Sequence, residues 1–573
     1  MLVLTAETIR PRFVDLYTPK LITVLREGYH ASDLKADMLA GLTVAIVALP
    51  LSMAIAIASG VTPDRGLYTS IVGGFIISAF GGSRFQIGGP AGAFIVLVAG
   101  TVQKYGVDGL LIATFLSGLI LLAVGLLRLG TFIKYIPYPV TVGFTSGIAI
   151  IIFASEIKDL LGLTLHGPEP GPLVAKLGTL GAALPTINPA AVAVAAVAIG
   201  IIVALRKLRP TWPAFLIATA VTAIAAWVLH LPVETLGSRF GGIPRSLPMP
   251  HMPSVNTGRI VELLPSALAF ALLGGIESLL SAVVADSMTG RRHRSNAELV
   301  AQGMANIGSA LFGGVCATGT IARTATNVRA GARGPLAGMF HALFVLLFML
   351  VAAPLARYIP LAALAAILAV VCWNMAEKHE FATLVRASRG DALVVLATFL
   401  LVIFRDLPTG IVAGFALGTL LFMHRMSQSV AVRASRPVIG EDMPDAANDG
   451  AEPYTRAATT DPDIVLYRIS GAFFFGSAAS VSAALDRIGV HPKAYVIDFT
   501  DVPFIDSTAA ATMAGFVRTA RRHGAAVHLF GVDAAIRVSL EMHGVAPPEI
   551  GYCESLDDAM HAARIDRSGR TPA

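Results

Sequence analysis

The sequence predicts an α-helical polytopic membrane protein of fourteen segments, arranged as a seven-plus-seven inverted repeat with two half-helices and followed by a small α/β domain. Three observations support this fold class. Of the 573 residues, 55% are hydrophobic and only 14% are charged, against about a quarter charged in soluble domains. Long apolar stretches follow one another up to about residue 430. Two short apolar stretches also occupy matching places in the two halves.

The charge distribution divides the chain into two unlike parts. Residues 1–430 carry a net charge of +11 and residues 431–573 a net charge of −5, and such a sign change indicates separate domains. We therefore expect a membrane-embedded domain followed by an acidic soluble one, and no nucleic-acid partner. The three cysteines, Cys316, Cys372 and Cys553, fit neither a disulfide framework nor a metal site, so we expect no metal and no cofactor.

The membrane segments follow a charged lead-in. Residues 1–37 lack the pattern of a cleavable signal and are expected to be cytosolic. Two later stretches, about 88–100 and about 319–331, are too short to cross the hydrocarbon core and are predicted to be half-helices. Twelve stretches approach the length needed to cross it, namely 38–59, 64–81, 108–128, 138–156, 189–205, 212–230, 263–286, 296–312, 336–354, 360–376, 390–405 and 408–424.

The basic residues of the short loops predict the orientation. With the N-terminus inside the cell, every expected cytoplasmic connection after the first hairpin contains Lys or Arg, as the positive-inside rule requires. Four further basic residues fall in expected external loops: Lys176, Arg239, Arg245 and Arg259. We therefore expect a protein of the inner (cytoplasmic) membrane with both termini in the cytoplasm.

The half-helices occupy corresponding places in the two halves. Pro50 lies 40 residues before Pro90, and Glu277 lies 42 residues before Gly319. Matched interruptions of this kind predict an inverted repeat, although Gly and Pro also serve ordinary helix packing. The expected domains are an N-terminal segment (1–37), a transmembrane domain (38–430, with repeats at about 38–230 and 260–430), a linker (431–463), an α/β domain (464–565) and a tail (566–573).

The C-terminal part alternates strands and helices. Apolar residues recur at helical spacing over 509–520, with arginines on the opposite face. Asp506 precedes this helix and is predicted to be its N-cap. Phosphorylation of the neighbouring Ser507 is an alternative role for the same stretch. Three apolar runs are typical of buried strands: 464–469, 494–499 and 526–530.

Two half-helix N-termini that meet at the bilayer midplane are predicted to form an anion site. Their first N–H groups have no partner within the helix, and the positive ends of their dipoles point into the protein. Gly89, Ala91 and Ala322 are small enough to let a substrate approach the backbone. Pro90 loses no hydrogen bond in a first turn, and Thr320 opens the second half-helix.

Two charged residues are expected inside the membrane. Arg323 is predicted to neutralise an anion, or alternatively to snorkel or to pair with a structural carboxylate. Glu277 is predicted to titrate or to hold a cation during transport, with Ser281 one turn later as a further oxygen ligand. The alternative is a Glu277–Arg323 salt bridge that only joins two helices.

Other polar residues of the membrane part are assigned to packing. His341 faces an apolar helix and is expected to be a satisfied core histidine rather than a proton relay. A network at a helix end is expected for Asn296, Glu298, Gln302 and Asn306.

Several motifs resemble those of the sulfate permease (SulP) family. The C-terminal domain, with Asp506-Ser507-Thr508, resembles a STAS domain, the module shared by sulfate transporters and anti-sigma-factor antagonists. The resemblance covers nearly the whole chain. In the membrane part it rests on Pro63-Asp64-Arg65-Gly66-Leu67-Tyr68-Thr69-Ser70, on Gly89-Pro90, and on the runs NAELVAQG at 296–303 and ARTATNVRAG at 322–331.

The resemblance implies core and gate domains, anion binding between the third and tenth segments, elevator-like alternating access and homodimers. It also implies that Ser507 matches the serine phosphorylated in the antagonists. Many relatives have Gln where Leu51 stands. Carried onto this sequence, the substrate contacts are Leu51, Ile55, Ala91, Ala322 and Arg323, and the coupling residues are Glu277 and Ser281.

Together these features predict a secondary active transporter of a small anion, such as sulfate, bicarbonate or a C4-dicarboxylate. Bicarbonate relatives that use sodium have Asp where Glu277 stands, so the longer carboxylate favours a proton over sodium as the coupling ion. The alternatives are an anion channel or exchanger, a regulatory scaffold whose STAS domain binds a cytosolic partner, and a nucleobase permease, which Arg323 makes less favoured. No motif indicates an enzyme.

Overall fold

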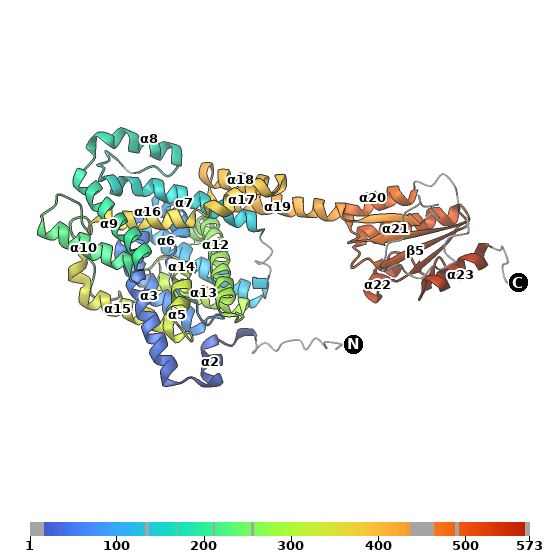
Figure 1. The fold of residues 1–573 in the computed structure, drawn as a ribbon, viewed down its shortest axis with the longest axis horizontal. Helices are drawn as coiled ribbons and strands as arrows, with labels where there is room; N and C mark the ends of the chain where they lie inside the picture. The colour runs from blue at the N-terminus through green and yellow to red at the C-terminus, as the bar shows by residue number, and fades with distance from the viewer. Residues whose placement is uncertain are drawn as a thin grey trace. The chain divides into compact units, whose positions relative to one another are not determined.

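The computed structural model describes residues 16–131, 137–167, 169–209, 212–253, 257–435, 463–486 and 492–567. The chain divides into two compact units, Met1–Ala416 and Leu417–Ala573. The first unit is helical, and the second combines a five-stranded sheet with helices (Figure 1). The start of the expected lead-in, most of the expected linker and most of the expected tail lie outside the described residues.

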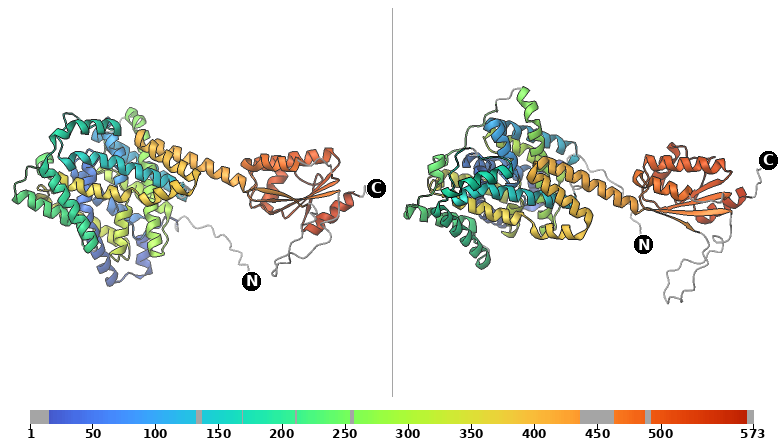
Figure 2. Two further views of the ribbon diagram at one scale, coloured as in Figure 1. Left: turned by 45° about the horizontal axis from the view of Figure 1, so that its top comes forward. Right: turned by 90° about the horizontal axis from the view of Figure 1, so that it is seen from above.

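The helical unit contains long apolar helices (Figure 2). In chain order its helices are α2 (Lys20–Gly28), α3 (Ala31–Ala58), α4 (Pro63–Tyr68), the π-helical turn η1 (Thr69–Gly73), α5 (Gly74–Phe80), η2 (Gly92–Phe94), α6 (Ile95–Leu126), η3 (Leu129–Thr131), α7 (Tyr138–Leu161), α8 (Leu173–Ala183), η5 (Leu184–Thr186), α9 (Pro189–Leu208), α10 (Ala214–Val228), α11 (Leu236–Phe240), α12 (Thr257–Thr289), α13 (Ser295–Leu311), α14 (Ile321–Arg329), α15 (Leu336–Ala356), α16 (Leu361–Met375), α17 (Lys378–Ala387), α18 (Arg389–Phe404) and α19 (Leu407–Gln428).

Eight helices in the described part are long and apolar enough to cross a membrane. Each of the fourteen expected segments overlaps a helix or a consecutive group of helices. The two numbers differ because α10, α13, α14 and α18 have only 15, 17, 9 and 16 residues. In addition, η1 interrupts the second segment, and α6 joins the first half-helix to the next segment through a break at Gly106. The count of fourteen spans stays a prediction.

Small residues let these helices pack closely. A Cβ on either Gly118 of α6 or Gly303 of α13 would lie 2.7 Å from the other glycine's carbonyl oxygen. Gly143 on α7 meets Thr398 on α18 in a similar way. Close backbone approach through glycine is the usual means of helix association in membranes, where burying apolar surface gives little gain. The half-helix α14 packs against α3 and α12, and η2 lies against α6, α7 and α12. Helix α7 packs mainly with α9, α16 and α18.

One buried carboxylate ties the start of α3 to the loop before α15. Asp37 is fully buried and accepts hydrogen bonds from the Tyr29 hydroxyl at 2.6 Å and from the N–H groups of Arg333 and Gly334 at 2.6 and 3.0 Å. Burial raises the pKa of Tyr29, so its hydroxyl stays a donor. The loop before α15 therefore has a fixed backbone position.

The second unit is built on a sheet of order β3-β4-β5-β6-β7. The pair β3–β4 is antiparallel and the other pairs are parallel. Helices cover both faces, with the apolar side of α21 on one and α23 on the other. The three expected strands and the expected helix are all present. The elements are β3 (Ala431–Ser435), β4 (Ile464–Ser470), α20 (Phe475–Asp486), β5 (Ala494–Asp501), α21 (Ser507–Arg522), β6 (Ala526–Phe530), α22 (Ala534–Met542), β7 (Gly551–Cys553) and α23 (Leu556–Arg567).

The first strand of this sheet falls inside the stretch expected to be a linker, 431–463. Residues Ala431 to Ser435 pair with Ser470 to Leu466 along the whole length of β3. The sequence did not indicate a strand there, because β3 is an edge strand. Such a strand needs few apolar residues, since its one neighbour supplies the hydrogen bonds. The sheet therefore begins only two residues after α19 ends.

Candidate functional site

The two half-helices begin side by side. The short strand β1 (Gly88–Gly89) pairs with β2 (Thr318–Gly319) in antiparallel fashion, with Gly88 opposite Gly319. Ala91 then caps η2, which leads into α6, and Thr320 caps α14. The N–H of Thr320 donates to the carbonyl oxygen of Ile87 at 3.0 Å and continues the pairing. Two helix N-termini from distant parts of the sequence thus meet, as the sequence predicts.

The backbone here leaves room for nothing larger than glycine. A Cβ on Gly89, whose φ is +157°, would overlap Nη1 of Arg323, and a Cβ on Gly319 would overlap the side-chain amide of Gln86. That amide donates to the Ser278 hydroxyl at 2.8 Å. The strand pair is therefore packed against polar side chains that lie directly behind it.

Arg323 is 2% exposed and lies at the junction of the half-helices. Its Nη2 donates to the Ser52 hydroxyl at 3.0 Å and to the carbonyl oxygen of Pro90 at 3.3 Å, and its Nη1 donates to the Ser70 hydroxyl at 3.3 Å. The buried Nε makes no hydrogen bond. Among the described residues no carboxylate lies within ion-pair distance of this guanidinium, so the positive charge of Arg323 is not compensated by a neighbouring negative one.

The alternative of a Glu277–Arg323 salt bridge is not formed in this structure. Glu277 is 9% exposed on α12 and makes no ion pair or hydrogen bond within the described ranges. The charged group that acts on it electrostatically is Glu377, at the N-cap of α17. One carboxylate oxygen of Glu377 is itself buried without a hydrogen-bond partner. Glu277 is thus buried without a cationic partner in the described part of the chain.

Ser281 lies one turn after Glu277, but its hydroxyl is used elsewhere. It donates to Oγ1 of Thr324 at 2.9 Å, and the same Oγ1 accepts the N–H of Ile87 at 3.1 Å. Ser281 therefore links α12 to α14 and to the segment before β1. This bond stabilises the half-helix pair.

The remaining predicted substrate contacts lie around the helix N-termini. Leu51 and Ile55 on α3 are 7% and 3% exposed and belong to the same buried apolar cluster as Ala91. Thr320 is buried, whereas Ala322 in the first turn of α14 is exposed. Helix α3 reaches the half-helices through Ser52, the residue after Leu51, whose hydroxyl accepts a hydrogen bond from Arg323.

Three residues near the site escaped the sequence analysis: Ser52, Ser70 and Glu377. Ser52 and Ser70 lie within an apolar helix and a helical motif, where serine usually bonds the backbone of its own helix. Their Oγ atoms are also 2.8 Å apart, a contact between α3 and η1 that sequence spacing does not show. Glu377 lies in a short loop among exposed charges, and nothing in the sequence distinguishes it.

The helix-end network expected on α13 is present. Glu298 accepts hydrogen bonds from the N–H groups of Gly82 and Ser83 at 2.9 and 3.1 Å. Asn306 bonds both backbone groups of Ala317, at 2.8 and 3.0 Å, directly before β2.

His341 is fully buried, as expected of a core histidine, but it is not satisfied. Neither ring nitrogen makes a hydrogen bond in the described part of the chain. Its backbone N lies beside Gly41 and its ring lies beside Gly74, and neither glycine has a side chain that could form a hydrogen bond.

Comparison with known proteins now decides the family. Residues 34–398 match the Sulfate permease family and residues 455–559 match the STAS domain. The chain belongs to the sulfate permease family. It is accordingly a polytopic membrane transporter of anions with a C-terminal STAS domain. A group of three or more metal-ligating side chains is not found among the described residues.

Relatives and solved structures extend over the whole permease. YvdB of Bacillus subtilis (strain 168), a protein assigned provisionally to sulfate transport, is 39% identical over 91% of this chain and 95% of its own. The bicarbonate transporter BicA of Synechocystis sp. is 30% identical, over 95% of this chain and 97% of its own. The transmembrane domain of a cyanobacterial BicA superposes with a TM-score of 0.60 at 32% identity, covering 67% of this chain and 98% of that one. Murine Slc26a9 in the inward-facing state has the same fold, with a TM-score of 0.84 at 20% identity over 98% and 96%.

Proposed function

We propose that this permease is a proton-coupled secondary active transporter of a small oxyanion, bound between the N-termini of η2 and α14. The observation that carries the proposal is the buried, uncompensated guanidinium of Arg323. A charge at such a depth is costly without a counter-charge, and here the protein supplies only hydroxyl and carbonyl oxygens. An anion at the helix N-termini would provide the missing negative charge.

The charge of the site favours a divalent anion. One guanidinium and two helix N-termini of about half a charge each amount to roughly two positive charges. Sulfate and C4-dicarboxylates match this value, while bicarbonate leaves an excess. The provisional sulfate assignment of YvdB supports sulfate, and the BicA relatives support bicarbonate. Sulfate is therefore the first substrate to test.

Glu277 is the proposed proton carrier. It is buried on a helix long and apolar enough to cross the membrane, and it has no cationic partner among the described residues. A carboxylate in that position is a candidate for binding and releasing a proton during transport. Elevator movement of the half-helix group against α7, α9, α16 and α18 would carry anion and proton together. Ser281 contributes through the hydrogen bond to Thr324 that holds α14 in place.

The decisive experiment is uptake of labelled sulfate, bicarbonate and fumarate into proteoliposomes, with and without an inward proton gradient. We expect the gradient to drive concentrative uptake of sulfate. Glu277→Gln should abolish concentration while retaining anion binding and exchange, because a neutral amide cannot release a proton. Glu262→Gln, an exposed position on the same helix, is the matched control. Fluxes of all three anions that ignore the gradient would refute proton coupling.

The other proposals concern assembly and placement. We expect a homodimer in the inner membrane with both termini cytoplasmic. Ser507 is exposed at the first position of α21, while Asp506 accepts the N–H of Ala509 at 2.9 Å and so provides the predicted cap. Ser507 is therefore free for modification or for a cytosolic partner. Single-channel currents would favour an anion channel. Competition by uracil would favour a nucleobase permease. The absence of anion flux in every assay would favour a regulatory scaffold.

A further inference from the structure

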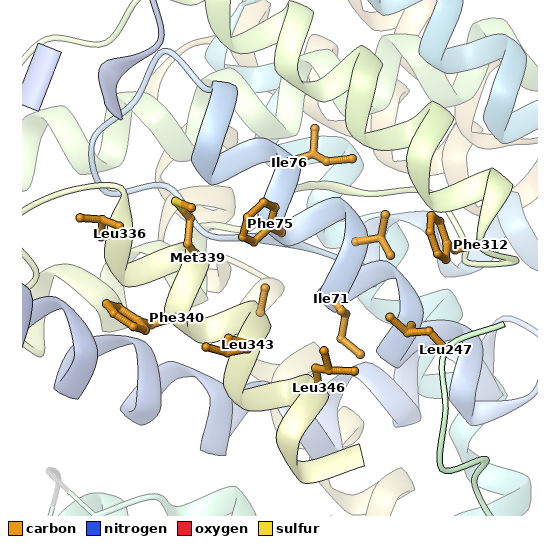
Figure 3. A pocket seen from close by; sticks show the side chains of 12 residues that line it. Ile71, Phe75, Ile76, Leu247, Phe312, Leu336, Met339, Phe340, Leu343 and Leu346 are labelled. Atoms are coloured by element: carbon orange, nitrogen blue, oxygen red, sulfur yellow. The ribbon is translucent and has the colours of Figure 1, made fainter. Parts of the chain in front are cut away.

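A wholly apolar groove lies on the outer side of η1 and α5. It has a volume of about 430 Å³. Figure 3 shows Phe340, Leu343 and Leu346 of α15 facing Ile71 and Phe75 across it. Met339, Ala342 and Leu336 complete its α15 wall, and Phe312 and Leu247 close one end. Every lining side chain is a hydrocarbon or a thioether.

The rim of the groove carries exposed apolar side chains. Phe75 and Leu343 on its rim are 43% and 53% exposed, and Leu347, one turn further along α15, is 51% exposed. α15 is one of the helices long and apolar enough to cross a membrane. Its lining residues occur at positions 336, 339, 340, 342, 343 and 346, on one side of that helix. A groove of this volume has room for a row of methylene groups such as those of an acyl chain.

A cationic side chain lies at the end where α15 begins. Arg333, three residues before Leu336, is exposed and forms no ion pair within the described ranges. Its backbone N–H is bonded to the buried Asp37, which fixes the loop. A phosphate at the membrane surface and an acyl chain in the groove would thus find complementary partners along one edge of the protein.

The wall between the groove and the anion site is a single helix thick. On its outer side Ile71 and Phe75 line the groove. On its inner side the Ser70 hydroxyl accepts a hydrogen bond from Arg323 at 3.3 Å. A Cβ on Gly73 would come within 2.7 Å of Ala317, the residue before β2. A Cβ on Gly74 would come within 2.9 Å of the carbonyl oxygen of Gly88, which belongs to β1. The turn η1 therefore contacts the groove through its side chains and the half-helix strands through its backbone.

We propose that this groove binds one acyl chain of a bilayer phospholipid, with its phosphate near Arg333, and that the bound chain supports the position of η1 and hence of Arg323. In a closely packed protein an unfilled groove of this size leaves its walls without contacts on one side. An acyl chain supplies those contacts and limits the movement of Ile71 and of the Ser70 hydroxyl behind it. The second part of this inference, the effect on the anion, rests on the proposed function.

Photolabelling tests the lipid site without any transport. The full-length protein is placed in nanodiscs that contain a phosphatidylglycerol with a diazirine in its acyl chain, and adducts are located by mass spectrometry. We expect adducts concentrated on residues 71–76 and 336–346. Leu343→Trp should fill the groove and lower labelling at these residues by at least about fivefold. Leu347→Trp, equally exposed but outside the groove, should leave it unchanged.

Each outcome is decisive. Adducts spread evenly over the lipid-facing helices, labelling unchanged by Leu343→Trp, or adducts joining two protein chains at these residues would overturn the lipid site. Should Leu343→Trp fail to fold, Leu346→Ala enlarges the groove and should change the labelling yield. Equal labelling with phosphatidylcholine would show that the phosphate common to both lipids is recognised, and not the rest of the headgroup. Loss of labelling in Arg333→Gln would confirm that Arg333 binds this phosphate.

Sulfate binding in the same nanodiscs tests the link to Arg323. We expect Leu343→Trp to change the sulfate dissociation constant at least about threefold, and Leu347→Trp to leave it unchanged. Equal sulfate dissociation constants in the two variants would overturn the link between the groove and Arg323. The labelling pattern would still decide whether the groove binds lipid. If the unaltered protein binds none of the three anions, the proposed function fails and the acyl-chain site stands or falls on labelling alone.

Discussion

At the scale of single residues, Arg323 depends on neutral oxygens for its position. Ser52 provides the shorter of its two hydroxyl contacts, at 3.0 Å, and also donates to the carbonyl oxygen of Ala48. Such an arrangement orients a guanidinium without neutralising it. The same charge paired with a carboxylate would have little remaining attraction for a substrate.

Ser52→Ala should weaken anion binding without unfolding the protein. A hydrogen bond to a charged group is worth about 1.5–3 kcal/mol, and part of it is retained through Ser70 and Pro90. We expect the dissociation constant for sulfate to rise about five- to tenfold, measured by calorimetry in detergent. Ser59→Ala on the same helix, where the hydroxyl bonds only Ile55, should leave the constant unchanged. Equal effects of the two substitutions would contradict this role of Ser52.

Gly89→Ala tests the contact between strand and guanidinium. The added Cβ would overlap Nη1 of Arg323, and the φ of +157° is uncommon for L residues. We expect anion uptake to fall by more than about tenfold through displacement of Arg323. Gly100→Ala on α6, where a Cβ meets nothing within 4 Å, is the control and should transport normally. Normal uptake by the Gly89 variant would show that the guanidinium can move without loss of function.

Sequence reasoning found the charges of the site but not their partners. Arg323 and Glu277 stand out because charges are rare in apolar segments. The bonds of Arg323 to Ser52 and Ser70 depend on how α3 and η1 cross, as does the approach of Glu377 to Glu277. Periodicity within one helix contains no information about such crossings. The alternative of a Glu277–Arg323 salt bridge therefore could not be excluded from the sequence.

At the scale of elements, the strand pair β1–β2 is anchored by α13. Asn306 donates to and accepts from the backbone of Ala317, next to Thr318. Half-helices are readable from the sequence because Gly and Pro end a helix early. The pairing of their leading strands is not readable, because two residues are too few for a strand pattern. The same applies to η1, a π-helical turn within an otherwise regular apolar stretch.

Asn306→Ala should destabilise the site and the fold together. It removes both bonds to Ala317 and leaves buried backbone groups unpaired, which costs about 2–4 kcal/mol. We expect a clearly lower Tm in detergent. We also expect weaker sulfate binding, because the strand pair beside the anion site loses its anchor. As a comparison, Asn188→Ala removes the cap of α9 and a hydrogen bond to the carbonyl oxygen of Pro232. The cap is worth about 1 kcal/mol, and the substitution should lower Tm without affecting sulfate binding. An unchanged Tm for Asn306→Ala would argue against the anchor.

At the scale of the whole molecule, the boundary between the membrane helices and the STAS domain is sharper than the sequence suggests. Composition changes near residue 430, and the domain order is readable from it. The strand β3 is not, because Ala431 to Ser435 gain their hydrogen bonds only from β4. A truncation placed by composition would therefore cut the sheet.

The position of a truncation should decide how the membrane domain behaves. A chain ending at Arg436 keeps β3 without β4, and an unpaired strand is a template for aggregation. A chain ending at Gln428, the last residue of α19, carries no such strand. We expect size-exclusion chromatography to give a single symmetrical peak for the shorter chain and higher aggregates for the longer one. Identical profiles would show that β3 needs no partner.

The pairing of Gly88–Gly89 with Thr318–Gly319 also has a consequence for synthesis. The ribosome must add more than 200 residues after β1 before β2 exists, which takes roughly ten to fifty seconds at about 5–20 residues per second. During that time the first half-helix has polar backbone in the membrane and no partner strand. Its insertion must therefore be delayed, or protected by the translocation machinery, until the second half of the chain arrives.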